Sequence, residues 1–199
     1  MKKFLIATLL CLIGAQCFAQ QEYKATVFGC KSDGITDNTG SIQRAIDFIS
    51  EKGGGTLVFY VGRYVTGAVE LKSNVTIKLA EAAVLVGTTN IYGYKGAPAL
   101  VWAKDQTNVA IIGKGVIQGN SKALLANIEG QKAKGYLSEA SVPALISFEG
   151  CQDARISELK LQDSPAEKAI IGNAQVEGVH IIANGTITTP EGKVVKINK

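Results

Sequence analysis

Carboxylates are the side chains in this sequence best suited to chemistry, and four of them lie in one short stretch. They are Glu149, Asp153, Glu158 and Asp163. Two carboxyl groups about 6.5–9.5 Å apart can hydrolyse a glycosidic bond, because one protonates the leaving oxygen while the other activates a water molecule. If neighbouring strands stack on this stretch, Asp105 or Glu177 could also come near it.

Structural roles account for the same carboxylates. Asp153 occupies the position in a repeated turn that Asn74 and Asn108 occupy elsewhere, which predicts a ladder of side chains along stacked turns. Glu158 and Asp163 alternate with apolar residues, so both are expected to face solvent. The sequence contains no Asp-Asp pair. We therefore assign no catalytic residue.

The histidine and cysteine residues do not suggest a metal or cofactor site. His180, the single histidine, lies between apolar residues and is expected to be an outward-facing strand residue. Cys30 and Cys151 are far apart in sequence, so a disulfide cannot be assumed, and both fit buried small apolar positions. The glycine triplet at 53–55 lacks the Lys-Ser/Thr that completes a phosphate loop. No metal ligand set and no cofactor are expected.

The charge of the chain argues against a nucleic-acid partner. The formal net charge is +4 over 199 residues, and the three arginines are scattered. A hydrophobic fraction of 46% with 22 glycines favours a turn-rich β protein of one domain.

Residues 1–19 have the pattern of a secretory signal peptide. Lys2 and Lys3 precede an apolar run, and residues 17–19 make a passable cleavage site. The apolar run is shorter than the roughly 20 residues of a membrane span, and Gln16 is a poor neighbour for lipidation at Cys17. We expect an exported protein, periplasmic or secreted, whose domain covers residues 20–199 and has no membrane span.

An amphipathic helix is predicted over 39–52. Its apolar residues, Ile42, Ala45, Ile46 and Ile49, recur at helical spacing. Asp33 and Asp37 fit turn and helix-capping roles before it. A short strand is expected at 25–28 and another at 56–60, after the glycine triplet. The apolar face of the helix fits the open end of a solenoid, which needs a cover.

A loose repeat follows the helix and predicts a solenoid. The segments 74–77, 108–111, 153–156 and 178–181 share a turn residue, an apolar residue, an outward residue and a β-branched apolar residue. Short β-branched strands that repeat in this way favour stacked parallel β coils. A β-sandwich is the alternative, but it needs hairpin signals, and Asn184-Gly185 is the one Asn-Gly signal in the chain.

The stretch 121–141 interrupts the repeat. It is rich in Lys, Ala and Gly, and Leu124, Leu125 and Ile128 could form a short helix. It is either a solvated surface excursion or a contact surface on one side of the solenoid.

Five segments in order resemble the polygalacturonases, glycoside hydrolase family 28. Residues 28–39 (FGCKSDGITDNT) are similar to the opening of pectin-degrading β-helix proteins. Residues 53–67 (GGGTLVFYVGRYVTG), 71–79 (LKSNVTIKL) and 107–117 (TNVAIIGKGVI) resemble motifs that follow in that family, as do PALISF and LQDSP within 143–165. The resemblance implies a right-handed parallel β-helix with an N-terminal capping helix, and a pectin-degrading ancestry.

The resemblance also implies where catalysis would reside. In family 28 the catalytic Asp residues belong to NTD and DD motifs, supported by GHG and RIK motifs, all beyond the NSP motif. Here the residues after Asp163 contain no Asp and no Arg. Gln118 replaces the Asp of the family's GVIDG, and Val142 replaces an Arg.

Three hypotheses follow from this comparison. The first is a truncated relative of a pectin hydrolase, without the catalytic motifs. The second is a non-catalytic carbohydrate-binding or structural β-helix that uses the 121–141 insertion as its contact surface. The third is an enzyme whose carboxylates we do not identify. The expected partner is an acidic plant polysaccharide such as pectin or galacturonan, and an uncovered end near the last strand, 194–197, predicts self-association.

Overall fold

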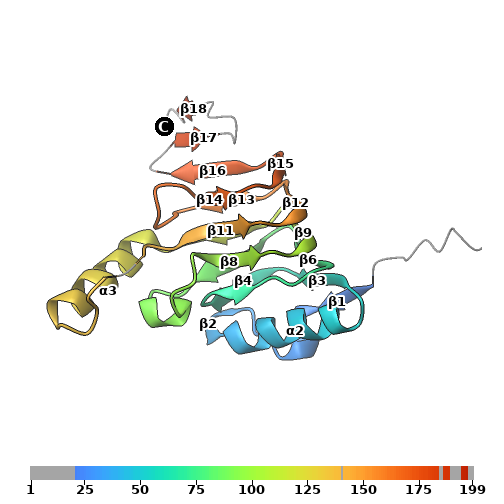
Figure 1. Cartoon of the computed structure of the whole chain (residues 1–199), viewed down its shortest axis with the longest axis horizontal. Helices are drawn as coiled ribbons and strands as arrows, with labels where there is room; N and C mark the ends of the chain where they lie inside the picture. The colour runs from blue at the N-terminus through green and yellow to red at the C-terminus, as the bar shows by residue number, and fades with distance from the viewer. Residues whose placement is uncertain (1–20, 140, 184–185, 189–193, 197–199) are drawn as a thin grey trace, which may run out of the picture.

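The chain forms a right-handed parallel β-helix whose coils stack along one axis (Figure 1). The computed structural model describes residues 21–139, 141–183, 186–188 and 194–196. The proposed signal peptide lies outside the described residues. Three sheets, called A, B and C below, form the sides of the β-helix. A complete coil adds one strand to each of the three sheets.

Sheet A contains β1 (Glu22–Lys24), β3 (Gly55–Phe59), β6 (Val75–Leu79), β9 (Thr107–Ile112), β12 (Gln152–Ser157) and β15 (Gln175–Glu177). Sheet B contains β2 (Asp33–Asp37), β4 (Gly62–Thr66), β7 (Ala83–Gly87), β10 (Val116–Gln118), β13 (Lys160–Gln162), β16 (His180–Ala183), β17 (Thr186–Thr188) and β18 (Val194–Lys196). Sheet C contains β5 (Val69–Glu70), β8 (Ala99–Lys104), β11 (Ala144–Glu149) and β14 (Ile170–Gly172).

Aliphatic side chains stack inside the helix at equivalent positions of successive coils. In sheet A the register aligns Leu57, Ile77, Ile111, Ile156 and Val176. The first four of these side chains are fully buried. Because side chains alternate between the faces of a strand, one inward residue in two suffices to build a continuous core.

The core ends at helix α2 (Thr39–Glu51), which lies across the N-terminal end of the stack (Figure 1). Ile42, Ala45, Ile46 and Ile49 are fully buried, as the helical spacing predicts. The helix packs against β3, β5 and the 3-10 helix η1 (Ala25–Phe28). The predicted end cap is therefore confirmed.

The predicted strand at 25–28 is wrong, because these residues form η1. The extended segment is instead β1, which pairs with β3. A four-residue run with three apolar residues does not distinguish a strand from a helical turn, and Gly29 at φ 85° closes the turn.

The fourth predicted repeat is also out of register. Arg155 pairs with Gln175 in sheet A, whereas His180 pairs with Lys160 in sheet B. Gly178 therefore stacks on Glu158, and both adopt positive φ. In sequence, Gly178 and Glu158 resemble the turn position of Asn74, Asn108 and Asp153. In the structure they belong to a different corner of the coil.

The last strands of sheet B reverse direction. β16 and β17 pair antiparallel, with Ala183 opposite Thr186, and β17 pairs antiparallel with β18. Asn184 and Gly185, the hairpin signal of the sequence, lie between the paired strands but outside the described residues. The remainder of the stack is parallel, so the β-sandwich alternative is wrong.

The 121–141 insertion contains helix α3 (Ser121–Ala133), which projects from the stack on the side of sheet C (Figure 1). The short helix suggested by the sequence is present, and its Leu124 and Ile128 are buried. The side chain of Asn127 accepts a hydrogen bond from the backbone of Ile91 at 3.1 Å. This bond joins α3 to the 3-10 helix η2 (Ile91–Tyr94).

Candidate functional site

The four carboxylates from Glu149 to Asp163 are distributed around the perimeter of the coil. Glu149 ends β11 in sheet C, and Asp153 lies in β12 of sheet A. Glu158 occupies the corner before β13, and Asp163 follows β13. Different sheets and corners thus separate residues that are neighbours in sequence.

Each of these carboxylates has a structural setting. Glu149 forms an ion pair with Lys104 at 3.7 Å, and Asp163 accepts a hydrogen bond from Ser121 at 2.7 Å. Glu158 is exposed, as predicted. Asp153 lies opposite Asn108 at φ 52°. The predicted turn ladder is present, and Asn108 Nδ2 donates to Asn74 Oδ1 at 3.0 Å.

The histidine and cysteines also lie as the sequence predicts. His180 is exposed on β16. Cys30 and Cys151 are free thiols, and both are buried. Among the described residues, no three His, Cys, Asp or Glu side chains are grouped so that they could hold a metal ion. Within the same part of the chain, no helix is long and apolar enough to cross a membrane.

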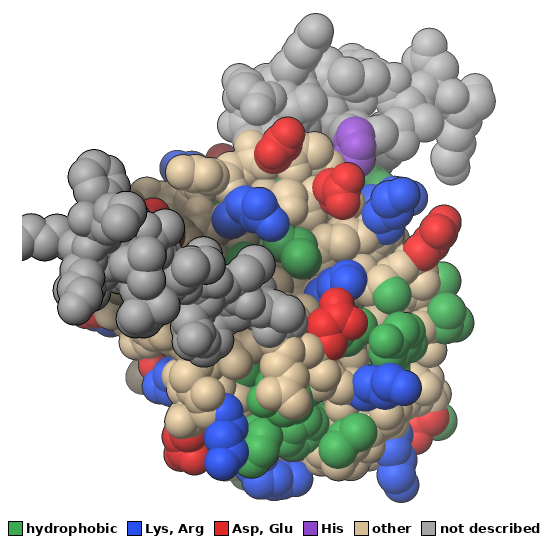
Figure 2. Space-filling view, turned by 90° about the vertical axis from the view of Figure 1, so that its right-hand side faces the viewer, with side chains coloured by type: hydrophobic (Ala, Val, Ile, Leu, Met, Phe, Trp, Pro, Cys, Tyr) green, Lys and Arg blue, Asp and Glu red, His purple; other side chains and the backbone are tan. Residues whose placement is uncertain are grey.

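Charge is mixed on the face that carries sheet A. Figure 2 shows Lys and Arg side chains interspersed with Asp and Glu over this face, without a continuous area of one sign. Lys78, for example, forms an ion pair with Glu22 at 2.8 Å. This face therefore has no surface suited to a polyanion such as nucleic acid.

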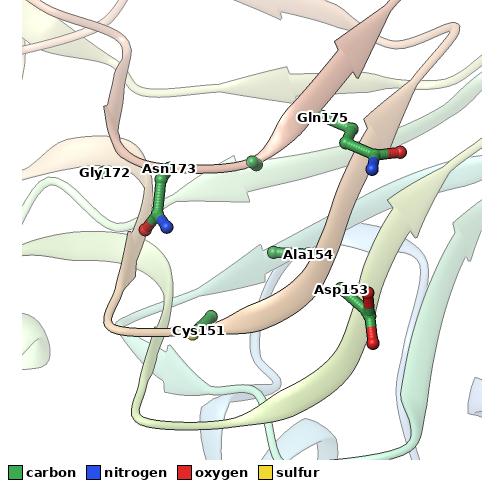
Figure 3. A pocket seen from close by; sticks show the side chains of 7 residues that line it. Cys151, Asp153, Ala154, Gly172, Asn173 and Gln175 are labelled. Atoms are coloured by element: carbon green, nitrogen blue, oxygen red, sulfur yellow. The ribbon is translucent and has the colours of Figure 1, made fainter.

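A small hollow lies between two neighbouring coils, at the corner between sheets C and A (Figure 3). Its volume is about 300 Å³. The lining residues are Cys151, Asp153, Ala154, Gly172, Asn173, Ala174 and Gln175. Gly172 is required here, because a Cβ atom would lie 1.7 Å from the carbonyl oxygen of Phe148. The hollow results from close stacking of two turns and contains no aromatic platform.

A larger groove, of about 860 Å³, lies between α2 and sheet C. We call it the α2 groove. One wall is a polar stripe of α2 that includes Gln43, Arg44 and Asp47. The opposite wall is the segment 93–98, which comprises the end of η2 and the residues after it, and the floor contains Glu70 and Trp102. This volume falls within the range of ligand sites.

The floor of the groove follows from strand pairing. Glu70 of β5 and Trp102 of β8 are directly paired, so their side chains lie side by side on the outer face of sheet C. Trp102 is partly exposed. An indole ring beside a carboxylate offers an apolar face for a ring and a hydrogen-bond acceptor for its substituents.

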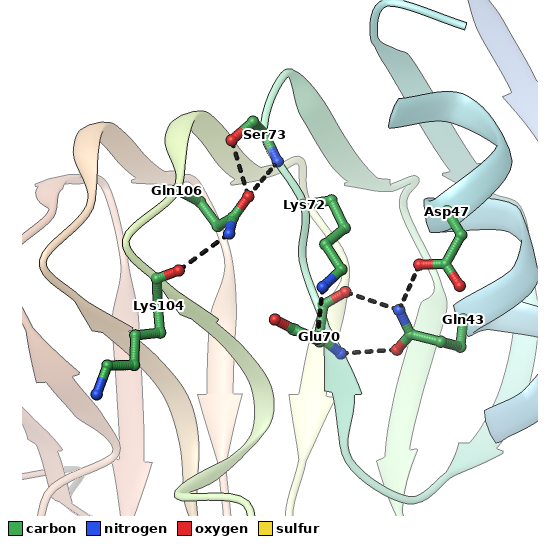
Figure 4. A network of polar contacts seen from close by, with 7 residues as sticks. All are labelled: Gln43, Asp47, Glu70, Lys72, Ser73, Lys104 and Gln106. Carbon is green, nitrogen blue, oxygen red and sulfur yellow. Dashed lines mark hydrogen bonds and ion pairs between the residues drawn. The ribbon is translucent and has the colours of Figure 1, made fainter. Parts of the chain in front are cut away.

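A hydrogen-bond network holds the helical wall against the floor (Figure 4). Gln43 Oε1 accepts from the Glu70 amide at 2.8 Å, and Gln43 Nε2 donates to the Glu70 carbonyl at 3.0 Å. The same Nε2 donates to Asp47 Oδ1 at 2.9 Å. Farther along sheet C, Lys72 pairs with Glu70 at 2.6 Å, and Ser73 donates to Gln106 at 2.8 Å through both its amide and its hydroxyl. The Gln43 contacts thus hold α2 against β5 along one side of the groove.

Sequence reasoning missed this groove. Trp102 is the single tryptophan, but nothing in its neighbourhood identified it as part of a site. Arg44 and Asp47 could be placed on the exposed face of the predicted helix. Arg44, Asp47 and Trp102 come together only because β5 pairs with β8 beneath α2.

Comparisons with known proteins agree with the fold. No family model matches the chain. An exo-poly-alpha-D-galacturonosidase of Dickeya chrysanthemi is 36% identical over 115 residues, which are 48% of this chain and 19% of that protein. The chain thus spans about a fifth of that relative's length. A family 28 exopolygalacturonase of Yersinia enterocolitica shares the fold, with a TM-score of 0.67 and 24% identity over 80% of this chain and 38% of the other.

A crystal structure from Parabacteroides merdae is more similar. That protein is assigned to the glycosyl hydrolases and is 47% identical to this chain, with a TM-score of 0.77. The match covers 81% of this chain and 74% of that one. The chain therefore belongs with the glycosyl hydrolases of the parallel β-helix fold, and it resembles the polygalacturonases of glycoside hydrolase family 28.

Proposed function

We propose that the chain binds a plant polysaccharide of the pectin class and does not hydrolyse it by itself. The observation that carries the proposal is the α2 groove, in which the partly exposed Trp102 lies among carboxylate, amide, guanidinium and ammonium groups. A sugar ring presents an apolar face and a rim of hydroxyls. Apolar pockets with a few well-placed polar groups suit such ligands.

The non-hydrolytic part of the proposal has separate support. Family hydrolysis needs two carboxylates at a defined separation. The carboxylates of the coil from Glu149 to Asp163 are divided among sheets and corners, and the sequence has no Asp-Asp pair. The second candidate is a glycosidase that uses other carboxylates, which the similarity to the Dickeya exo-galacturonosidase favours.

Binding can be tested with the single tryptophan as the probe. Titration of the protein with pectin oligosaccharides should change Trp102 fluorescence. Trp102→Ala should weaken binding several-fold as measured by calorimetry, because the variant loses the apolar surface that the indole would bury against a sugar ring, at about 25 cal/mol per Å². Tyr60→Ala is the matched control, because Tyr60 is exposed and lies outside both the groove and the 121–141 insertion. Equal affinity of the Trp102 variant and the wild type would contradict the assignment of the groove.

Hydrolysis can be tested on the same material. Purified protein incubated with polygalacturonate or with pectin should release no more reducing ends than the same substrate in buffer alone. Sustained release that scales with protein concentration would overturn the non-hydrolytic proposal and favour the glycosidase.

We also infer that the chain is exported. The pattern of residues 1–19 supports this inference. N-terminal sequencing of protein from the periplasm or medium should begin near residue 20, and a sequence that begins at Met1 would contradict the inference.

A further inference from the structure

The charge balance of the α2 groove bears on which kind of pectin chain it can hold. This inference rests on the proposed function, because it concerns the ligand of the same groove. The charged side chains that line the groove are Asp37, Asp47, Glu70, Arg44 and Lys95. Three negative and two positive groups give the lining a formal charge of −1.

The carboxylates have acceptor capacity left for a ligand. Glu70 pairs with Lys72 at 2.6 Å, and Asp47 accepts one hydrogen bond from Gln43 through Oδ1. Asp37 Oδ1 accepts from the amide of Thr39 at 2.9 Å. An ionised carboxylate can accept about four hydrogen bonds. Each of the three can therefore accept further hydrogen bonds from ligand hydroxyl groups.

The cations do not form a carboxylate-binding cradle. Arg44 Nη2 donates to Ser41 Oγ on the same helix at 3.1 Å, so one of its guanidinium nitrogens is already engaged within α2. Lys95 is exposed in the opposite wall. Lys72 is paired with Glu70, and Lys104, farther along sheet C, is paired with Glu149. Counting Lys72 with the groove brings the total charge to zero, with no excess of positive charge.

A polyanion would gain little in such a groove. Each of its carboxylates would approach fixed carboxylates as well as cations, and repulsion would offset the attraction. Sites for polyanions instead have an excess of positive charge or bidentate arginines. A chain whose rings carry hydroxyls and no charge would donate to the groove carboxylates and accept from Arg44 and Lys95.

We propose that the α2 groove binds uncharged pyranose residues, which stack on Trp102 and donate hydroxyl hydrogens to the groove carboxylates. Two sources offer this chemistry: galacturonan whose carboxyl groups are methyl-esterified, and the neutral galactan of pectin. Free galacturonate is the disfavoured form.

The test compares three oligosaccharides of equal length by calorimetry and Trp102 fluorescence. They are an acidic oligogalacturonate, the same oligomer fully methyl-esterified, and a neutral galactan oligomer. The two uncharged oligomers, or one of them, should bind at least about fivefold tighter than the acidic oligomer at low salt. The uncharged oligomer with the higher affinity identifies the part of pectin that supplies the ligand. Equal or tighter binding of the acidic oligomer overturns this inference and leaves the proposed function intact, whereas no binding of any oligomer overturns the proposed function.

The substitution Asp47→Asn tests the effect of charge on binding, because it changes the shape of the side chain little. Asp47→Asn keeps an oxygen that can accept from Gln43 but removes one negative charge. It should raise the affinity for the acidic oligomer by a few-fold, with the gain reduced in high salt, and should raise the affinity for the esterified oligomer less. Glu81→Gln is the control, since Glu81 is exposed and outside the groove. Equal gains for both oligomers with Asp47→Asn would contradict the electrostatic argument.

Discussion

Single residues in left-handed conformations determine how the coils turn. Asn74, Asn108 and Asp153 have φ values of 65°, 54° and 52° and succeed one another along one corner of sheet A. Asn and Asp tolerate this conformation because their short polar side chains bond locally. In this protein the side chains also bond between coils, from Asn108 to Asn74.

Substitution at Asn108 should separate the backbone contribution from the amide contribution. Asn108→Ala should lower the free energy of unfolding by about 2 kcal/mol, because it loses one hydrogen bond and puts a Cβ-bearing residue without local bonding into the left-handed region. Asn108→Gly loses the same bond without the conformational strain and should cost less. Urea denaturation measures both, and an equal cost for the two variants would show that strain plays no part.

Asp33 begins β2, the irregular strand before α2, and should titrate at unusually low pH. Hydrogen bonds from Thr36 and from the amide of Ile35 lower the pKa of Asp33 to about 2. Because the pKa is lower in the folded state, the associated stability is present above the ordinary pKa near 4. It is lost as the pH falls through about 2.

Carboxyl NMR titration should therefore place the pKa of Asp33 about two units below that of a free Asp side chain. Thr36→Val removes the hydroxyl that donates to Asp33 Oδ2 at 2.6 Å and should move the pKa upward. An unchanged pKa in this variant would contradict the assignment of the hydroxyl as the largest cause.

Cys30 should be chemically inert in the folded protein. Burial raises the pKa of its thiol to about 11, against an opposing effect of Arg44. Because the folded pKa is raised, the stability linked to the neutral thiol is present below about pH 9. It is lost as the pH rises through about 11.

Iodoacetamide at neutral pH should modify Cys30 slowly in native protein and rapidly in urea, as mass spectrometry of tryptic peptides would measure. Cys30→Ser removes the site as a control. Fast labelling of native Cys30 would show that the thiol is accessible.

At the scale of elements, α2 covers the open end of the core and also forms a wall of the groove. Ile46→Ala should lower the free energy of unfolding by about 2–5 kcal/mol, because a fully buried side chain leaves a cavity at the end of the stack. Glu51→Ala, on an exposed position of the same helix, should change stability little. Similar urea midpoints for the two variants would contradict the capping role.

Periodic elements could be predicted from the sequence, and short or irregular ones could not. The buried face of α2 follows from helical spacing over several turns, and α3 follows from Leu124, Leu125 and Ile128. The predicted register of the repeat that begins at Gly178 is wrong, because its four-residue pattern occurs at two different corners of a coil. A pattern of this length identifies a turn followed by a strand but not the sheet to which the strand belongs.

At the scale of the whole molecule, the described stack has exposed strand edges. β14 and β15 each pair with one described neighbour, β11 and β12, whereas β16 is followed by the antiparallel strands β17 and β18. The expected self-association therefore stays a prediction for sheets A and C, whose outermost described strands have unpaired edges.

Sedimentation velocity should detect concentration-dependent dimers that persist in high salt. Ile171→Lys, a partly exposed position of β14, should reduce association, while Ile35→Lys at the opposite end should not. A strictly monomeric wild-type protein at high concentration and high salt would contradict the prediction.

The sequence by itself determined the class of fold, the end cap and the family, because each depends on patterns that are local or repeat along the chain. Alternating apolar residues, turn asparagines and helical spacing all act over a few residues. The tertiary structure decided which side chains meet. The four carboxylates from Glu149 to Asp163, neighbours in sequence, are spread around a coil, while Arg44, Glu70 and Trp102, distant in sequence, share one groove. The physical reason is that a β-helix places residues beside one another through coil length and register, which the insertions between strands change.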